Sequence, residues 1–197
     1  KSFNMKIIPI LVLLCFLFVV NGSNLIDGFN GLLAIHFLLI SFILLLINLA
    51  NQNENFSIIL FSQIIIVLSF LLFNFPKAKI FLGDGGSYLL GTLIALNTIK
   101  TYELNLTISP FFYTSILFYL FYEVFFSFIR KSLKKNSPLK PDNFHLHMLI
   151  YKKLLKRNND KLKSNYSVSI VLNLVYLILI LPAIFMMEAG MFCKYYS

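Results

Sequence analysis

The sequence predicts an all-α protein, a polytopic bundle of transmembrane helices. Hydrophobic residues make up 58% of the 197 residues, and the mean hydropathy is +0.81, whereas soluble domains are roughly 45–50% apolar. The apolar residues also gather in six runs, and a helix needs about 20 mostly apolar residues to cross a bilayer. We expect about six spans, near residues 5–20, 32–50, 57–75, 87–102, 108–129 and 167–187.

Two of these runs need comment. The fourth is short and is interrupted by Gly91 and Asn97. The first could alternatively be a signal peptide with the sequence MKIIPILVLLCFLFVVNGS, but no small-residue cleavage site follows it. We therefore expect the first run to be the end of a helix in a protein that begins upstream.

Basic residues are concentrated in one loop. Residues 130–163 contain 11 Lys or Arg and two acidic residues, which accounts for the whole net charge of +9. Because Lys/Arg-rich loops stay on the cytoplasmic side, we place a basic loop, 130–166, inside, and alternating spans then place 21–31 and 76–86 inside too. Attraction to anionic headgroups alone would explain most of this charge. We treat residues 1–197 as a single integral-membrane domain.

Two glycine-flanked aspartates lie in these cytoplasmic loops. They are Asp27 in NLIDGFNGLL and Asp84 in KIFLGDGGSYLLG. Each precedes an apolar run, so we expect each at a helix start, where a carboxylate and backbone N–H groups together suit phosphate and a hard cation. Mg²⁺ typically uses one or two protein carboxylates. The alternative is that Asp-Gly is turn chemistry that caps a helix.

Polar neighbours extend both motifs. Asn24 and Asn30 flank Asp27 at offsets of three and could orient a nucleotide or the aspartate. Gly85 and Ser87 follow Asp84, and we count both as candidate ligand contacts, although Ser87 could instead cap the helix.

A third candidate region is SPLKPDNFHLHMLIYKK. His145 and His147 lie among lysines, which favours contact with phosphate. Together with Asp142 they could suggest zinc, but no third His or Cys lies nearby. A weakly amphipathic helix is expected to follow them.

Glu123 is unusual because it lies within the fifth apolar run. It precedes Arg130 by about 10 Å of helix, and a carboxylate at such depth is a functional candidate. The alternative is a buried hydrogen bond or a pairing with a basic residue. Arg130, at the rim, is a candidate substrate contact, and His36 is expected to be a satisfied interior polar group.

In order and spacing, NLIDGFNGLL, KIFLGDGGSYLLG and PDNFHLHMLIYKK resemble the polyprenyl-phosphate N-acetylhexosamine-1-phosphate transferases of glycosyltransferase family 4. The resemblance implies transfer of a sugar-1-phosphate from a UDP-N-acetylhexosamine to polyprenyl (undecaprenyl) phosphate. UMP would be released, Mg²⁺ would be the cofactor, and the reaction would open a surface-polysaccharide pathway. It implies a bacterial cytoplasmic membrane with a cytoplasmic active face and no nucleic-acid partner, and it allows a homodimer.

The resemblance also implies roles for individual residues. Asp84 would coordinate the metal, and Asn24 and Asp27 would line the catalytic and nucleotide pocket. His145 and His147 would contact phosphate or nucleotide from the basic loop.

Three departures from the family pattern stand out. Asn30 occupies a position where many members have a second aspartate, and Met148 one where a further histidine is frequent. The paired aspartates that precede the NLIDG motif in the family are missing, and the family has about ten or eleven helices. We therefore expect the chain to be a C-terminal portion of a longer enzyme, with little or no activity on its own.

Two other classes of function remain as alternatives. A transporter would explain Glu123 and the glycine-interrupted helix, but its polar residues should cluster near the bilayer midplane. A non-catalytic scaffold would tolerate replacement of Asp27 and Asp84 without loss of UDP-sugar binding.

Overall fold

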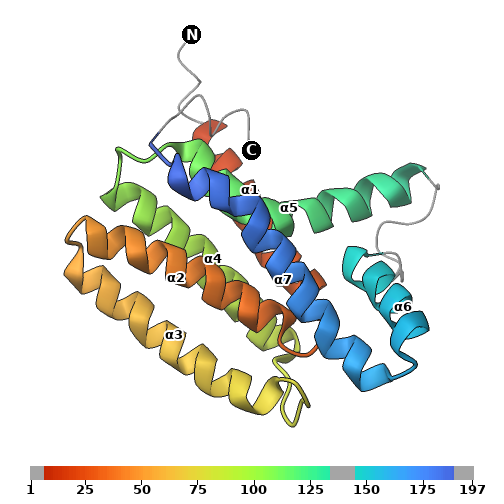
Figure 1. Ribbon diagram of the computed structural model, residues 1–197. Coiled ribbons are helices and arrows are strands. Elements are labelled where there is room, and N and C mark those ends of the chain that lie inside the picture. Colours follow the sequence, from red (N-terminus) through yellow and green to blue (C-terminus); the bar gives the residue numbers. More distant parts are fainter. Residues whose placement is uncertain (1–6, 134–144, 189–197) are drawn as a thin grey trace.

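The computed structural model describes residues 7–133 and 145–188, and within these ranges it is built from helices without strands (Figure 1). Five of the helices in these ranges are long and apolar enough to cross a membrane, so the chain is a multi-pass membrane protein. The helices are α1 (Ile7–Ile26), α2 (Leu32–Ala50), α3 (Glu54–Asn74), α4 (Gly83–Leu104), α5 (Pro110–Leu133), α6 (Leu146–Asn158) and α7 (Lys161–Phe185).

The predicted fourth span is α4, which differs from the other five. It has 22 residues, but it starts with GDGG and ends with KTYEL, so it does not reach the hydropathy of the others. It packs against α1 and α2. The predicted amphipathic helix after the histidines is α6, which packs against α7. Residues 134–144 of the basic loop, including Asp142, lie outside the described residues.

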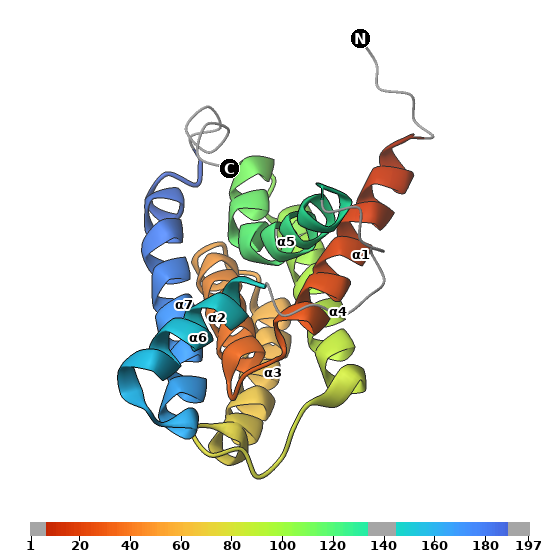
Figure 2. The same cartoon turned by 90° about the vertical axis from the view of Figure 1, so that its right-hand side faces the viewer.

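The bundle is organised around α2. Two thirds of this helix is buried, against under a quarter of α3, and Figure 2 shows α2 enclosed by neighbouring helices. It packs against α3, α4 and α7. The outer helices instead expose large apolar side chains such as Ile66 and Leu72 of α3. In a membrane such a surface contacts lipid, so the exposed apolar residues are consistent with the predicted spans.

Small residues let α1 approach its neighbours closely. A Cβ atom on Gly22 would lie 2.5 Å from the backbone oxygen of Leu120 in α5, and one on Gly91 of α4 would lie 2.8 Å from the side chain of Ser23 in α1. Helices in lipid associate largely through such contacts of small residues. These contacts fix where α1 ends relative to the start of α4.

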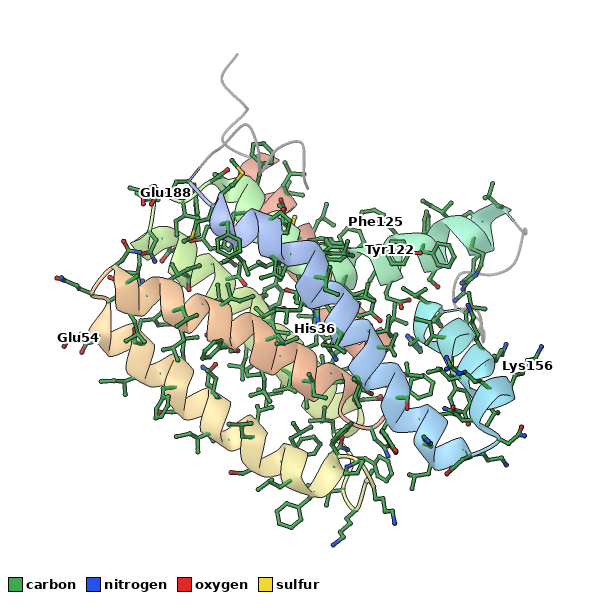
Figure 3. The ribbon with its side chains drawn as sticks, viewed as in Figure 1. His36, Glu54, Tyr122, Phe125, Lys156 and Glu188 are labelled. Carbon is green, nitrogen blue, oxygen red and sulfur yellow. The ribbon has the colours of Figure 1, made fainter. Side chains whose placement is uncertain are left out.

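The loops gather at the two ends of the bundle as the charge pattern predicts. At one end, Asn53 donates to Asn105 Oδ1 at 3.2 Å, and the Ser109 amide donates to the Met187 carbonyl at 3.0 Å. Figure 3 shows Glu54 and Glu188 toward this end and Lys156 toward the other. The loops that contain the two Asp-Gly motifs lie at the end of Lys156.

We predict that Gly22→Ala lowers the free energy of unfolding by about 1–3 kcal/mol, because the new methyl group meets backbone that cannot move without separating α1 from α5. Unfolding in detergent, followed by circular dichroism, would measure this. Gly85→Ala is the matched control, because a Cβ there meets nothing within 4 Å. Equal stability of the two variants would contradict the close packing of α1 and α5.

Candidate functional site

A small cavity opens where α1 ends and α4 begins. It has a volume of about 210 Å³, and both Asp-Gly motifs contribute to its wall. Ligand pockets that enclose a whole small molecule measure about 300–1,000 Å³, so this cavity has room for a phosphate group and a hydrated cation. Its lining residues are Asn24, Asp27, Gly28, Phe29, Asn30, Asn74, Phe81, Leu82, Gly83 and Asp84.

Asn24, in the last turn of α1, connects the two motifs. Its side-chain amide donates to Ser87 Oγ at 2.9 Å and to Asp84 Oδ1 at 3.3 Å. Ser87 is fully buried and donates in turn to the Asp84 carbonyl at 3.0 Å. Ser87 therefore does not cap α4. Instead, its two hydrogen bonds hold the Asn24 side chain and the Asp84 backbone, and Ser87 itself does not line the cavity.

Asp84 occupies the position that the sequence predicts. It lies in the first turn of α4, where the unpaired N–H groups of a helix start favour negative charge. Gly83 precedes it with a φ of 63°, a left-handed conformation that glycine adopts without strain.

Asp27 does not lie at a helix start, so that prediction is wrong. It follows the last residue of α1, in the loop that leads to α2. Apolar α2 begins only at Leu32, and the two residues before it are tied by hydrogen bonds to other helices, Asn30 to α7 and Gly31 to α3. The Asp27 carboxyl is therefore near the carbonyl end of α1, which offers a negative charge no stabilisation.

The surroundings of the Asp27 carboxyl disfavour its ionised form. Burial, followed by the negative charge of Asp84, raises the pKa of Asp27 from 3.8 to about 6. Because the folded pKa is raised, this group favours folding below pH 4, and that contribution is lost as the pH rises through 6. Above pH 6 the ionised pair is a natural place for a cation.

Asn30 fastens the α1–α2 loop to two other parts of the chain. Its backbone N–H donates to Asn165 Oδ1 at 2.9 Å, and its carbonyl accepts from Ser169 Oγ at 2.7 Å, both in α7. Its side-chain amide donates to the Pro76 carbonyl at 2.9 Å. Asn30 thus holds the loop as well as lining the cavity.

Asn74, at the end of α3, is a site residue that the sequence analysis missed. Its Oδ1 accepts from the Gly31 amide at 2.6 Å, and its amide donates to the Ile80 carbonyl at 2.8 Å. It thereby joins the two motif-bearing loops. The feature of the sequence that could have identified Asn74 is its position as a polar residue at the end of an otherwise apolar run.

The two histidines lie beside the site and face a buried carboxylate. Nδ1 of His145 and Nδ1 of His147 are 3.4 and 3.3 Å from the carboxylate oxygens of Glu123 in α5. Glu123 therefore has the long-range pairing that was the alternative interpretation of its depth. Phosphate contact by the histidines stays a prediction.

The predicted site residues divide into two groups. Four of them line the cavity, and the others are not among its described lining residues. Gly85 borders open space, and Arg130 stacks over the Phe126 ring, 5.1 Å from its centre. His36 of α2 is buried against α5 and α7, where its Nδ1 lies 3.2 Å from Asn173 Oδ1 but its Nε2 has no hydrogen-bond partner among the described residues, so the expected satisfied polar group is only half satisfied. The four in the wall are Asn24, Asp27, Asn30 and Asp84.

The donor set at the cavity is made of oxygen atoms. Two carboxylates and nearby amide oxygens suit Mg²⁺, which prefers oxygen and needs few protein ligands. Across residues 7–133 and 145–188, no three His, Cys, Asp or Glu side chains are grouped to hold a metal ion.

Known proteins are similar to this chain in sequence. The chain is 34% identical over 154 residues to the undecaprenyl-phosphate alpha-N-acetylglucosaminyl 1-phosphate transferase of Thermotoga maritima, which covers 78% of this chain and 47% of that protein. It is 44% identical over 81 residues to the phospho-N-acetylmuramoyl-pentapeptide-transferase of Leuconostoc citreum, which covers 40% of this chain and 25% of that protein. The decaprenyl-phosphate N-acetylglucosaminephosphotransferase of Mycobacterium leprae is 27% identical over 149 residues, 66% of this chain and 37% of that protein.

The chain thus spans about half the length, or less, of these curated relatives. Its residues 1–102, more than half of the chain, match the sequence profile of Glycosyl transferase family 4. This match includes both Asp-Gly motifs and confirms the family that the motifs indicated. The chain belongs to glycosyl transferase family 4.

Proposed function

We propose that the intact protein carrying this chain transfers N-acetylhexosamine 1-phosphate from a UDP-sugar to a polyprenyl phosphate, releasing UMP. The observation that carries the proposal is the convergence of two Asp-Gly loops on one cavity at one end of a membrane bundle. Its relatives are named as transferases that act on polyprenyl phosphates. The bundle end with α6 would face the cytoplasm of a bacterium, because basic loops stay inside.

The cavity volume supports binding of the diphosphate of the donor. About 210 Å³ is too small for a complete UDP-sugar, so the uridine and the sugar would extend over its rim. The start of α4 would offer backbone N–H groups to a bound phosphate. Lys152, Lys153, Lys156 and Arg157 on α6 are exposed and would attract the two anionic substrates to this end.

The two carboxylates fit Mg²⁺, which Asp84 and Asp27 would hold together. When bound, the ion would neutralise charge that develops on the phosphoryl oxygens. Asn24 would keep the Asp84 carboxylate oriented through its 3.3 Å hydrogen bond. The Asp27 carboxyl, with its pKa of about 6, is largely ionised at neutral pH.

The chemistry is a phosphoryl transfer. An oxygen of the polyprenyl phosphate would form a bond to the phosphorus that bears the sugar, and the bond from that phosphorus to UMP would break. The second pKa of a phosphate monoester is near 6, so an ionised Asp27 could accept its remaining proton. In this role Asp27 is a base in the one-step route, in which the polyprenyl phosphate attacks the donor directly. Asp27 could also be the nucleophile of a two-step route.

We predict that Asp84→Asn lowers UMP release at least 100-fold, because the cation that would compensate the developing negative charge loses a carboxylate ligand. The assay would use the intact protein in detergent with undecaprenyl phosphate, Mg²⁺ and a panel of UDP-N-acetylhexosamines. Glu103→Gln is the matched control, because Glu103 is exposed and pairs with Lys100 at the opposite end. If the folded wild type released no UMP from any donor, or Asp84→Asn kept full activity, the proposal would be wrong.

We predict further that cation affinity falls as the pH is lowered through 6. Protons compete with the cation for Asp27, so affinity should drop roughly tenfold for each pH unit below that pKa. Titration with Mn²⁺, followed by electron paramagnetic resonance between pH 5 and 7.5, would measure the slope. Asp27→Asn should flatten it. A wild-type affinity that does not change with pH would contradict the role given to Asp27.

A further inference from the structure

Glu123 is the most deeply buried charged residue among the described acids, and three donors converge on it. Its exposed fraction is 0%. Oε1 accepts from the Tyr119 hydroxyl at 3.3 Å and lies 3.3 Å from His147 Nδ1, while Oε2 lies 3.4 Å from His145 Nδ1. A carboxylate inside a membrane span is costly unless such partners compensate it.

This arrangement determines which nitrogen of each histidine carries a proton. An ionised carboxylate can only accept hydrogen bonds, so both Nδ1 atoms must be donors. The other ring nitrogen, Nε2, then lies on the side of each ring away from Glu123. The two imidazole rings lie parallel, with 2° between their planes and 5.2 Å between their centres. One carboxylate therefore aligns both histidines.

The aligned His147 ring reaches the loop of Asp27. A Cβ atom on Gly28 would lie 3.6 Å from His147 Nε2, and Gly28 lines the cavity next to Asp27. Phe29 packs edge-on against the same ring, with 5.6 Å between ring centres. The ring thus lies between the buried carboxylate of α5 and the loop at the cavity.

We propose that Glu123 is a positioning residue for the transfer reaction. It holds Nδ1 of both histidines protonated and directs the unprotonated Nε2 of His147 toward the Asp27–Gly28 loop, where its lone pair can accept a hydrogen bond from a protonated substrate phosphate. The proposal rests on the proposed transferase function. If Glu123 had only a structural role, it would join α5 to α6, and the protonation and orientation of the two histidine rings would not affect the reaction.

The first test reads the rings directly and needs no turnover. Nitrogen-15 NMR of the histidine side chains in the intact protein would be recorded for the wild type and for Glu123→Gln. Spectra of His145→Gln and His147→Gln would assign the signals. We expect Nδ1 of both rings to be protonated in the wild type and at least one to change in Glu123→Gln, because an amide offers a single acceptor oxygen. The His36 signal should stay unchanged, since its Nδ1 faces Asn173.

The second test separates positioning from stability. We expect Glu123→Gln to lower kcat roughly 10- to 100-fold, as loss of an orienting partner does at other sites, with little change in KM for the donor. Glu123→Asp, which keeps the charge, should recover part of this loss. Asn97→Ala is the matched control, because it also removes a hydrogen bond between membrane helices, 2.6 Å long to Gln63. It should reduce stability but leave kcat unchanged.

The outcomes separate this inference from the proposed function. Unchanged ring signals, or a kcat equal to that of an active wild type, would overturn the role of Glu123 and leave the transferase intact. A folded wild type without UMP release would instead overturn the transferase. If Glu123→Gln fails to fold, the kcat values of Glu123→Asp, His147→Gln and the variant that combines them provide the test instead. Losses in kcat that do not add support positioning through His147, and additive losses overturn it.

Discussion

Side-chain amides at the ends of apolar helices hold the candidate site together. Loops at a membrane surface expose backbone groups that need partners, and this chain supplies them mostly with asparagine. Asn24 joins α1 to α4, Asn165 of α7 accepts from the backbone of the α1–α2 loop, and Asn74 joins the two motif-bearing loops. Without these connections the two aspartates would belong to separate loops with independent positions.

The consequence of this convergence is electrostatic. Two carboxylates that line one cavity repel each other, which contributes to the raised pKa of Asp27. A cation would relieve the repulsion, and phosphate groups would complete its coordination. Below the loops, Glu123 provides a third acidic group, which is compensated by histidines and a tyrosine and takes no part in the cavity wall. The chain therefore separates an acid pair that lines the cavity from an acid that is paired with other side chains, to which we assign an orienting role.

Sequence patterns predicted much of this arrangement. Apolar runs indicated the helices, and the position of Lys and Arg indicated which loops lie at the same end. Asp84 lies at the start of α4 as its glycine-rich context suggested. These features depend on local composition and on alternation across a membrane, both of which a single sequence contains.

The features that the sequence did not reveal depend on contacts between distant segments. Asp27 lies after α1 because asparagines of α3 and α7 hold the loop, and periodicity carries no information on such contacts. Ser87 faces Asn24 instead of capping its own helix. The pairing of Glu123 with His145 and His147 crosses from α5 to α6, so the depth of Glu123 marked it as unusual without identifying its partners.

The central claim is that Asp27 and Asp84 act on the same bound cation. A double-mutant cycle of Mn²⁺ affinity at pH 7.5, with Asp27→Asn, Asp84→Asn and the combined variant of the intact protein, tests it most directly. If both carboxylates hold one ion, each single change should remove most of the affinity and the combination should remove little more. Independent, additive losses, or no loss in either single variant, would contradict the claim.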